Sequence, residues 1–163
     1  MNDYILENNQ KIKKLEAGNI IINGDNNIID DVIVNGTIII YGSNNILRKI
    51  RFNNEDEGIR IYPKAIKNKI IECIFKNMRY GIVLYSSYNV IKDSFFFQNE
   101  YPLLICSSTN NIYNNQIYYN KNEIINKGVN NIAFNVFKTN KKVNNELSNG
   151  NHIISWISIA FII

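Results

Sequence analysis

Short apolar runs separated by polar bends recur along this chain. Six segments can be aligned on an initial asparagine, with an apolar residue two positions after it and another six positions after it. A mostly polar pair lies between these two apolar positions. The segments begin 18 to 24 residues apart and read NNIIDDVIVN (26–35), NNILRKIRFN (44–53), NKIIECIFKN (68–77), NVIKDSFFFQ (89–98), NIYNNQIYYN (111–120) and NIAFNVFKTN (131–140). A seventh copy begins at Asn151.

A second apolar run fills the rest of each period. The runs are GNIIIN (18–23), GTIIIY (36–41), GIRIY (58–62), GIVLY (81–85), PLLIC (102–106) and NEIIN (122–126). Each period therefore contains three short strands, a polar bend and an asparagine-marked turn. Such a repeat is typical of one coil of a solenoid whose strands pair with those of the next coil. We predict an all-β fold, a single-stranded right-handed parallel β-helix of about six to seven coils.

The alignment also predicts which side chains face inward. Equivalent residues of successive coils should stack in columns, with asparagines at corners that need a left-handed backbone. The two predicted interior columns are Ile28, Ile46, Ile70, Ile91, Tyr113 and Ala133, and Val32, Ile50, Ile74, Phe95, Ile117 and Phe137. By alternation along the strand, Phe75, Phe96 and Tyr118 should face outward.

The coils are expected to occupy residues 15–150, with residues 1–14 as an N-terminal cap. Residues 151–163 are uncharged after His152 and form either the last coil and an apolar cap or an interface with another copy. The apolar tail is too short to span a bilayer as a helix, so a membrane contact is not favoured. The candidate interface residues in this tail are Trp156, Ile157, Ile159 and Phe161.

Charge and cysteine content narrow the classes of partner. The net charge is +4, and the basic residues are spread along the chain, so we expect no nucleic-acid partner. Cys73 and Cys106 are far apart and are expected to be buried free thiols, with one disulfide as the alternative. The first residues lack the apolar core of a signal peptide, which favours an intracellular or virion-borne chain or one whose leader has been removed.

The repeat resembles that of right-handed parallel β-helix proteins of the pectate-lyase-like and NosD-type groups. The likeness rests on Asn89-Val90-Ile91-Lys92-Asp93-Ser94-Phe95 and the preceding Gly81-Ile82-Val83-Leu84, and it covers roughly residues 15–140. It implies the fold and leaves the function open, since such proteins include polysaccharide lyases, hydrolases, epimerases, tailspikes, adhesins and accessory proteins. The resemblance further implies that a lyase would use Ca²⁺ with an Arg or Lys base, and a hydrolase clustered aspartates.

Few residues match that chemistry. Glu72 and Asp93 should lie at one bend on adjacent coils, about 5 Å apart, a separation suited to a carboxylate pair. The bend column is not consistently acidic, so a solvated corner is the favoured interpretation and a catalytic pair the alternative. The loop Glu55-Asp56-Glu57 is expected to be solvated, with a Ca²⁺ site as the alternative, and no other cofactor is expected. His152 is the only histidine, which gives no support to a zinc site or a serine-histidine triad.

Two aromatic columns are the candidate ligand or partner face. They are Tyr41, Tyr62 and Tyr85, and Phe75, Phe96 and Tyr118. Stacked aromatics can simply stabilise neighbouring strands, or they can bind sugars or a protein partner. We expect a non-enzymatic structural or adhesive module that forms a homo-oligomer, as on a virion or cell surface. The alternative is a carbohydrate-binding or carbohydrate-cleaving protein that holds a polysaccharide on an outer face.

Overall fold

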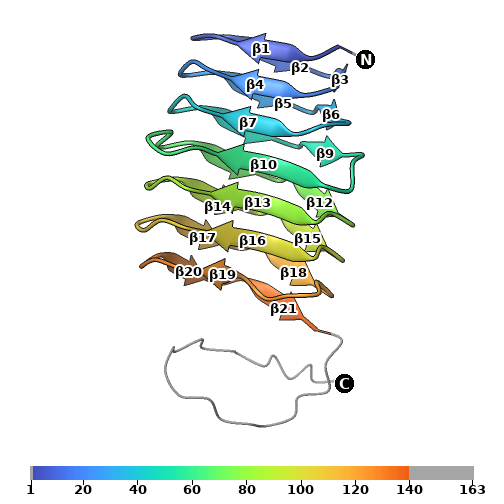
Figure 1. Cartoon of the computed structure of the whole chain (residues 1–163), viewed down its shortest axis with the longest axis vertical. Helices are drawn as coiled ribbons and strands as arrows, with labels where there is room; N and C mark the ends of the chain where they lie inside the picture. The colour runs from blue at the N-terminus through green and yellow to red at the C-terminus, as the bar shows by residue number, and fades with distance from the viewer. Residues whose placement is uncertain (1, 140–163) are drawn as a thin grey trace, which may run out of the picture.

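The chain forms a parallel β-solenoid in the computed structural model, which describes residues 2–139 (Figure 1). Three sheets of seven strands each run along the solenoid, and every coil contributes one strand to each sheet. The winding makes about 6 turns, and the described residues contain strands and turns without a helix, so none of them forms a helix that could cross a membrane. The predicted all-β solenoid is therefore confirmed.

The sheets, which we name A, B and C, are built from strands of two to five residues. Sheet A contains β1 (Tyr4–Leu6), β4 (Ile20–Ile22), β7 (Ile38–Ile40), β10 (Glu57–Ile61), β13 (Tyr80–Leu84), β16 (Tyr101–Ile105) and β19 (Ile125–Asn126). Sheet B contains β2 (Lys11–Lys13), β5 (Ile28–Asp30), β8 (Ile46–Arg48), β11 (Lys69–Ile71), β14 (Val90–Lys92), β17 (Asn111–Tyr113) and β20 (Asn131–Ala133). Sheet C contains β3 (Glu16–Ala17), β6 (Ile33–Val34), β9 (Arg51–Phe52), β12 (Ile74–Lys76), β15 (Phe95–Phe97), β18 (Gln116–Tyr118) and β21 (Val136–Lys138).

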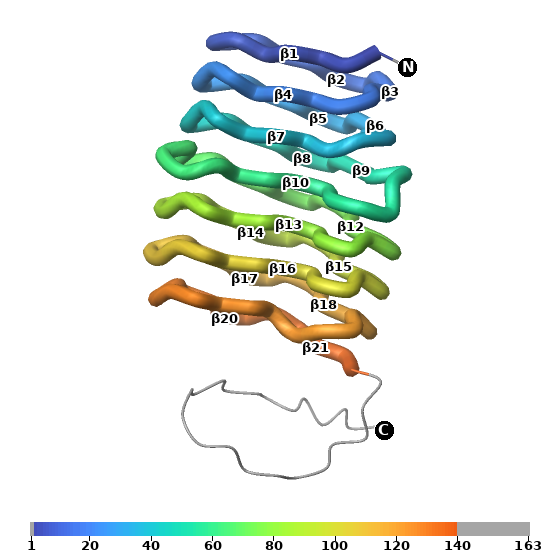
Figure 2. The backbone as a smooth tube through the Cα atoms, in the orientation of Figure 1, coloured from blue at the N-terminus to red at the C-terminus, as the bar shows by residue number. Residues whose placement is uncertain are grey.

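The first coil begins earlier than the sequence suggested. Strands β1 and β2 pair in register with β4 and β5, so residues 4–13 belong to the solenoid instead of forming a separate cap. Leu6 is buried, and Tyr4, Ile12 and Leu15 pack against the core as the first layer of its interior. Figure 2 shows the same path as a tube, with the first coil stacked on the second. The predicted last coil and the interface residues Trp156, Ile157, Ile159 and Phe161 lie outside the described residues.

The interior column of sheet B is displaced by one residue from its predicted position in four coils. Ile70 and Ile91 face inward as predicted, whereas Ile28 and Ile46 lie on the outer side of their strands. The register pairs Ile70 with Leu47 and Leu47 with Ile29, so the residue after Ile46 and the residue after Ile28 take the inward position. In the later coils the inward residues are Ile112 and Ile132, which precede the predicted Tyr113 and Ala133. The true interior column is Ile12, Ile29, Leu47, Ile70, Ile91, Ile112 and Ile132.

The prediction for sheet C is wrong at Phe75 and Phe96, which are fully buried. Ile74 and Phe95, predicted to be interior, instead face outward on β12 and β15. The reason is the corner before each strand, where Glu72 and Asp93 have φ of 55° and 53°. A left-handed residue turns the chain sharply, so counting alternate residues across the corner gives the wrong parity.

The buried phenylalanines form a continuous stack within the solenoid. Ring centroids are 5.2 Å apart between Phe52 and Phe75 and 4.7 Å apart between Phe75 and Phe96, with nearly parallel planes. The stack packs against glycine in sheet A: a Cβ at Gly81 would lie 2.5 Å from the carbonyl oxygen of Pro102 and 3.0 Å from the Phe96 ring. Glycine is required there because the backbones and the rings leave no room for a side chain.

A ladder of asparagines, all buried except the partly exposed Asn130, closes the corner between sheets A and B. Its members are Asn27, Asn45, Asn68, Asn89, Asn110 and Asn130. Each side-chain oxygen accepts a hydrogen bond from the backbone N–H of the equivalent residue in the preceding coil, at 2.7 to 2.9 Å, beginning with the N–H of Gln10 bonded to Asn27. Shorter ladders that contain Ser94, Asn115 and Asn135, and Asn99 and Asn120, serve the other two corners. Asparagines therefore occupy the corners as predicted, and their side chains join successive coils by hydrogen bonds.

The neighbouring residues Phe96 and Phe97 test the corrected register of sheet C. Phe96→Ala should lower the free energy of unfolding by about 3–5 kcal/mol, since it leaves a cavity in the ring stack. Phe97→Ala, on the outer face of the same strand, should cost about 1 kcal/mol or less. Denaturant titration followed by circular dichroism measures both, and equal losses would contradict the assigned faces.

A second adjacent pair tests the ladder. Asn110→Ala deprives the buried N–H of Asn89 of its acceptor, which should cost about 1–3 kcal/mol. Asn111→Ala, at an exposed site one residue away, should change the free energy of unfolding by about 0.5 kcal/mol or less. The two midpoints of thermal unfolding, measured side by side, should differ clearly. Indistinguishable midpoints would argue against the ladder as a source of stability.

Candidate functional site

The predicted carboxylate pair lies at an open corner. Glu72 and Asp93 occupy equivalent positions of adjacent coils, one residue after the paired Ile71 and Lys92. Glu72 is 3.9 Å from the ammonium group of Lys49, and Asp93 is 3.1 Å from that of Lys92. The bond to Asp93 raises the pKa of Lys92. The carboxylates of Glu72 and Asp93 are thus surrounded by solvent and lysine side chains, which supports the interpretation of this position as a solvated corner.

The three acidic residues Glu55, Asp56 and Glu57, at the start of β10, contact different partners. Glu57 is largely buried and binds Arg60, whose Nη2 is 2.6 Å from its carboxylate, and this hydrogen bond raises the pKa of Arg60. Asp56 is 4.0 Å from Arg79, and Glu55 lines a groove on the far side of the corner. Residues 2–139 bring together no group of three or more His, Cys, Asp or Glu side chains that could hold a metal ion.

The two cysteines are free. Cys73 is fully buried, and desolvation raises the pKa of its thiol to about 12, so it stays protonated and unreactive. Cys106 is only partly buried, on the outer side of sheet A just after β16. The expectation of two free thiols is confirmed, and that of full burial holds for Cys73 alone.

The predicted tyrosine column exists on the outer side of sheet A. The rings of Tyr41 and Tyr62 stack at 4.6 Å, and those of Tyr62 and Tyr85 lie tilted at 6.5 Å. Tyr41 and Tyr85 are among the exposed large side chains. Because the rings of Tyr41 and Tyr62 cover one face of each other, these two tyrosines present mainly ring edges and hydroxyl groups to solvent. Sugars stack on free ring faces, so this geometry suits a protein surface better than a chain of sugars.

Beside the tyrosines runs an apolar column that the sequence interpretation missed. Its members face outward between two inward residues of each strand, and sheet A faces the viewer in Figure 1. Successive pairing in register aligns Ile5, Ile21, Ile39, Arg60, Val83, Leu104 and Ile125. Tyr80 and Tyr101, stacked at 5.1 Å, border the column on the other side. We call the column and its two borders the sheet A strip.

A second aromatic surface lies on the outer side of sheet C. Phe95 and Phe97 stack at 5.7 Å on one strand, and Tyr118 and Tyr119 meet their edges from the next coil. The ammonium group of Lys76 lies 5.7 Å from the Phe97 ring and that of Lys138 lies 4.7 Å from the Tyr118 ring. Of the predicted outward residues Phe75, Phe96 and Tyr118, only Tyr118 belongs to this surface.

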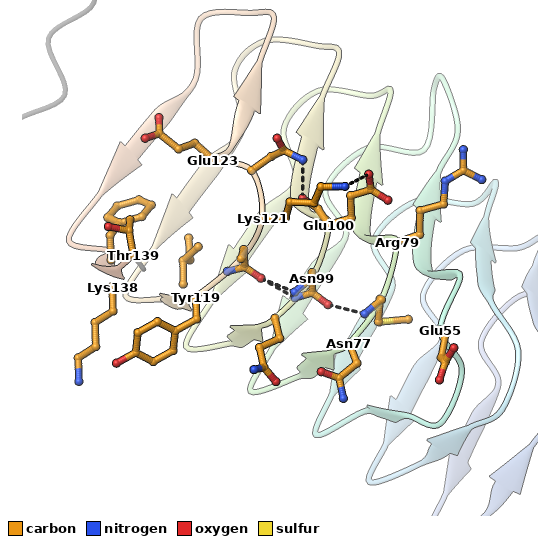
Figure 3. A pocket seen from close by; sticks show the side chains of 16 residues that line it. Glu55, Asn77, Arg79, Asn99, Glu100, Tyr119, Lys121, Glu123, Lys138 and Thr139 are labelled. Carbon is orange, nitrogen blue, oxygen red and sulfur yellow. Dashed lines mark hydrogen bonds and ion pairs between the residues drawn. The ribbon is translucent and has the colours of Figure 1, made fainter. Parts of the chain in front are cut away.

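A shallow groove of about 1140 Å³ follows the corner between sheets C and A (Figure 3). Its floor contains the ladder residues Asn99 and Asn120, and its walls carry charged side chains. Lys121 is 3.1 Å from the carboxylate of Glu100, and the amide of Asn122 donates to the Glu100 carbonyl oxygen. These polar groups therefore bond to one another across neighbouring coils, and the groove is a polar corner of the repeat like those of the other coils.

Comparison with family models, curated proteins and solved structures finds no match for this chain. The resemblance to pectate-lyase-like or NosD-type proteins therefore stands at the level of the solenoid, which the structure shows.

One buried carboxylate gives a prediction for pH dependence. Asp30 is 3% exposed and lies between Lys13, at 3.4 Å, and Arg48, which donates two hydrogen bonds of 2.8 and 3.0 Å. These bonds, those of Arg48 foremost, hold the pKa of Asp30 below its ordinary value of 3.8. The resulting stability is complete above that ordinary value and is lost as the pH falls through the lowered pKa.

We therefore expect Asp30→Asn to lower the thermal midpoint at neutral pH and to flatten its decline below about pH 4. Glu123→Gln, at an exposed position of the last coil, serves as the control and should leave the curve unchanged. Midpoints measured from pH 2 to pH 7 test this, and parallel curves for wild type and Asp30→Asn would refute it.

Proposed function

We propose that this protein is a non-enzymatic structural module that self-associates through the sheet A strip. The observation that carries the proposal is the outward column of sheet A, which is apolar in six of its seven coils. A virion or cell surface is a setting in which such a module would serve.

The residue pattern of sheet A is that of a sheet covered on both faces. Parallel sheets buried on both sides have continuous apolar strands, and sheets with one wet face alternate apolar and polar residues. Strands β4 and β7 each read Ile-Ile-Ile, whereas the outer positions of β2, β5 and β8 in sheet B include Lys13, Asp30 and Arg48. In the single chain Ile5 is 61% exposed, Val83 is already buried and the other apolar members are partly exposed. A partner sheet on the outer side would remove the remaining exposed apolar surface of the strip from water.

The size of the strip suits a dimer. Six coil spacings of about 4.8 Å give a length of about 29 Å, and five residues of about 3.3 Å give a width of about 17 Å. The flat area is about 500 Å² per copy, or about 1,000 Å² in total, which is where specific interfaces begin. A second copy presents the same strip and can therefore match it in length and apolar character.

The aromatic surface of sheet C favours a second candidate function, carbohydrate binding. Its Tyr119 ring and the adjoining Gln116 side chain are exposed, and the rings of Phe95, Phe97 and Tyr118 are partly exposed. Sugars bind to aromatic rings and amide groups. This candidate keeps the expected polysaccharide partner but places it on Phe95, Phe97 and Tyr118 instead of the tyrosine column.

Leu104→Lys tests self-association. Its ammonium group would have to be buried at the strip, so the dimer should weaken by at least about tenfold. Val90→Lys is the matched control, since Val90 is an outward, half-buried residue of sheet B, and it should leave the association constant unchanged. Light scattering and sedimentation equilibrium measure the masses, with circular dichroism to confirm folding.

A wild-type chain that stays monomeric at high concentration would overturn the proposal, as would equal weakening by both variants. A monomer that binds an oligosaccharide through Phe97 and Tyr118 would instead support the second candidate.

A further inference from the structure

We propose that a hollow on the outer side of sheet B binds the phosphate group of a small phosphate monoester, with Lys67 and Lys69 as the residues that hold it. The hollow lies on a different sheet from the sheet A strip, so this inference goes beyond the proposed self-association and does not depend on it.

The hollow has a volume of about 330 Å³ and lies at the corner where sheet A turns into sheet B. Three consecutive coils each contribute two residues, the one just before the ladder asparagine and the first residue of the sheet B strand. These residues are Asn44 and Ile46, Lys67 and Lys69, and Tyr88 and Val90. The corner residues have left-handed φ angles of 58°, 59° and 62°, and the strand residues pair in register. The repeat therefore fixes both lysines in the middle coil of the hollow.

The two lysines lack the counter-charges that basic residues have at the other edge of sheet B. There Lys13, for example, lies 3.4 Å from the carboxylate of Asp30. Within residues 2–139 neither Lys67 nor Lys69 forms an ion pair or a side-chain hydrogen bond, and both side chains are exposed. An anionic ligand would supply the missing counter-charge.

The neighbouring coils do not supply an acid to this edge either. Across five coils the corner column reads Asn26, Asn44, Lys67, Tyr88 and Thr109, and the strand column reads Ile28, Ile46, Lys69, Val90 and Asn111. Because equivalent residues of adjacent coils lie about 4.8 Å apart, these columns set the charge around the hollow, and it is positive.

The turn that carries Lys67 also interrupts the regular repeat. Seven residues, 62–68, join β10 to β11, whereas five residues, 41–45 and 85–89, join the equivalent strands of the coils on either side. The longer turn includes Lys64, which is exposed and whose carbonyl oxygen accepts a hydrogen bond from the Ser43 hydroxyl. A third lysine therefore belongs to the same turn. Binding residues are commonly found on loops that a rigid scaffold positions in this way.

The charge of the hollow favours a phosphate monoester among the common anionic groups. A phosphate monoester carries about −1.5 to −2 charges at neutral pH, which matches the two ammonium groups, and lysine binds phosphate as a point charge. A carboxylate would neutralise only one of the two. The side chains of Asn44 and Tyr88 have no hydrogen-bond partner within residues 2–139, and their amide and hydroxyl groups can donate to phosphate oxygens.

The size of the hollow favours a small molecule. Ligand pockets begin at about 300 Å³, so the hollow is at the lower limit of that range. Ile46 and Val90 are half-buried on either side of Lys69 and offer apolar contact to the carbon skeleton that carries the phosphate.

An NMR titration of the ¹⁵N-labelled full chain with glucose 6-phosphate tests the proposal. Amides of residues 44–46, 67–69 and 88–90 should shift, with a dissociation constant on the order of 1 mM, because exposed charge pairs each contribute little. Glucose at the same concentration should leave these amides unshifted, since it lacks the phosphate. The proposal is overturned if these amides stay unshifted with glucose 6-phosphate well above 1 mM, or if glucose shifts them equally.

Charge-removing variants provide the second measurement. Lys67→Gln and Lys69→Gln should each weaken the binding of glucose 6-phosphate about fivefold, and the double variant more than either. Lys11→Gln is the matched control, because Lys11 is an exposed residue of the same strand column, three coil spacings or about 14 Å from Lys69. It removes the same charge and should leave the dissociation constant unchanged at physiological salt. Equal weakening by Lys11→Gln, or no weakening by Lys67→Gln and Lys69→Gln, would also refute the site.

Discussion

Hydrogen bonding between one coil and the next is the constraint on which the rest of this structure depends. Each strand of two to five residues is far too short to persist alone, and it gains its backbone partners only from the equivalent strands above and below. At the corners the chain turns, and the N–H group of each ladder residue bonds to a side chain of the next coil instead of to a backbone carbonyl. Buried asparagine side chains supply the missing acceptors, so the hydrogen bonding continues around the coil.

The repeat was legible in the sequence because stacking demands the same residue type at the same place in every coil. Its parity was harder to infer. Several coils carry two adjacent asparagines, such as Asn44 and Asn45, of which only the second is buried in the ladder. The wrong choice moves the interior column by one residue. In the coils with a single asparagine, those of Asn68 and Asn89, the sheet B residues Ile70 and Ile91 were placed correctly, and the error arose only beyond the next corner, in sheet C.

Only the tyrosine column of the sheet A strip could be predicted from the sequence, for a related reason. Tyrosines repeated at equal spacing attract attention in a sequence, and their column exists. The outward isoleucines of β4 and β7 cannot be recognised in this way, because in a run of three isoleucines every residue is compatible with the interior. A usable signal was present: strands that are apolar at every position are typical of parallel sheets covered on both faces, whereas strands with one face in water alternate apolar and polar residues.

The direction of the asparagine ladder makes the two ends of the solenoid chemically unequal. A coil donates its corner N–H to the side chain of the coil that follows, as from Asn89 to Asn110. Loss of coils from the N-terminal side leaves a side-chain oxygen without its donor, and one water can donate to that oxygen instead. Loss of coils from the C-terminal side leaves a backbone N–H group without its acceptor beside the core. Duplication or shortening of the repeat during evolution should therefore be tolerated more readily at the beginning of the solenoid than at its end.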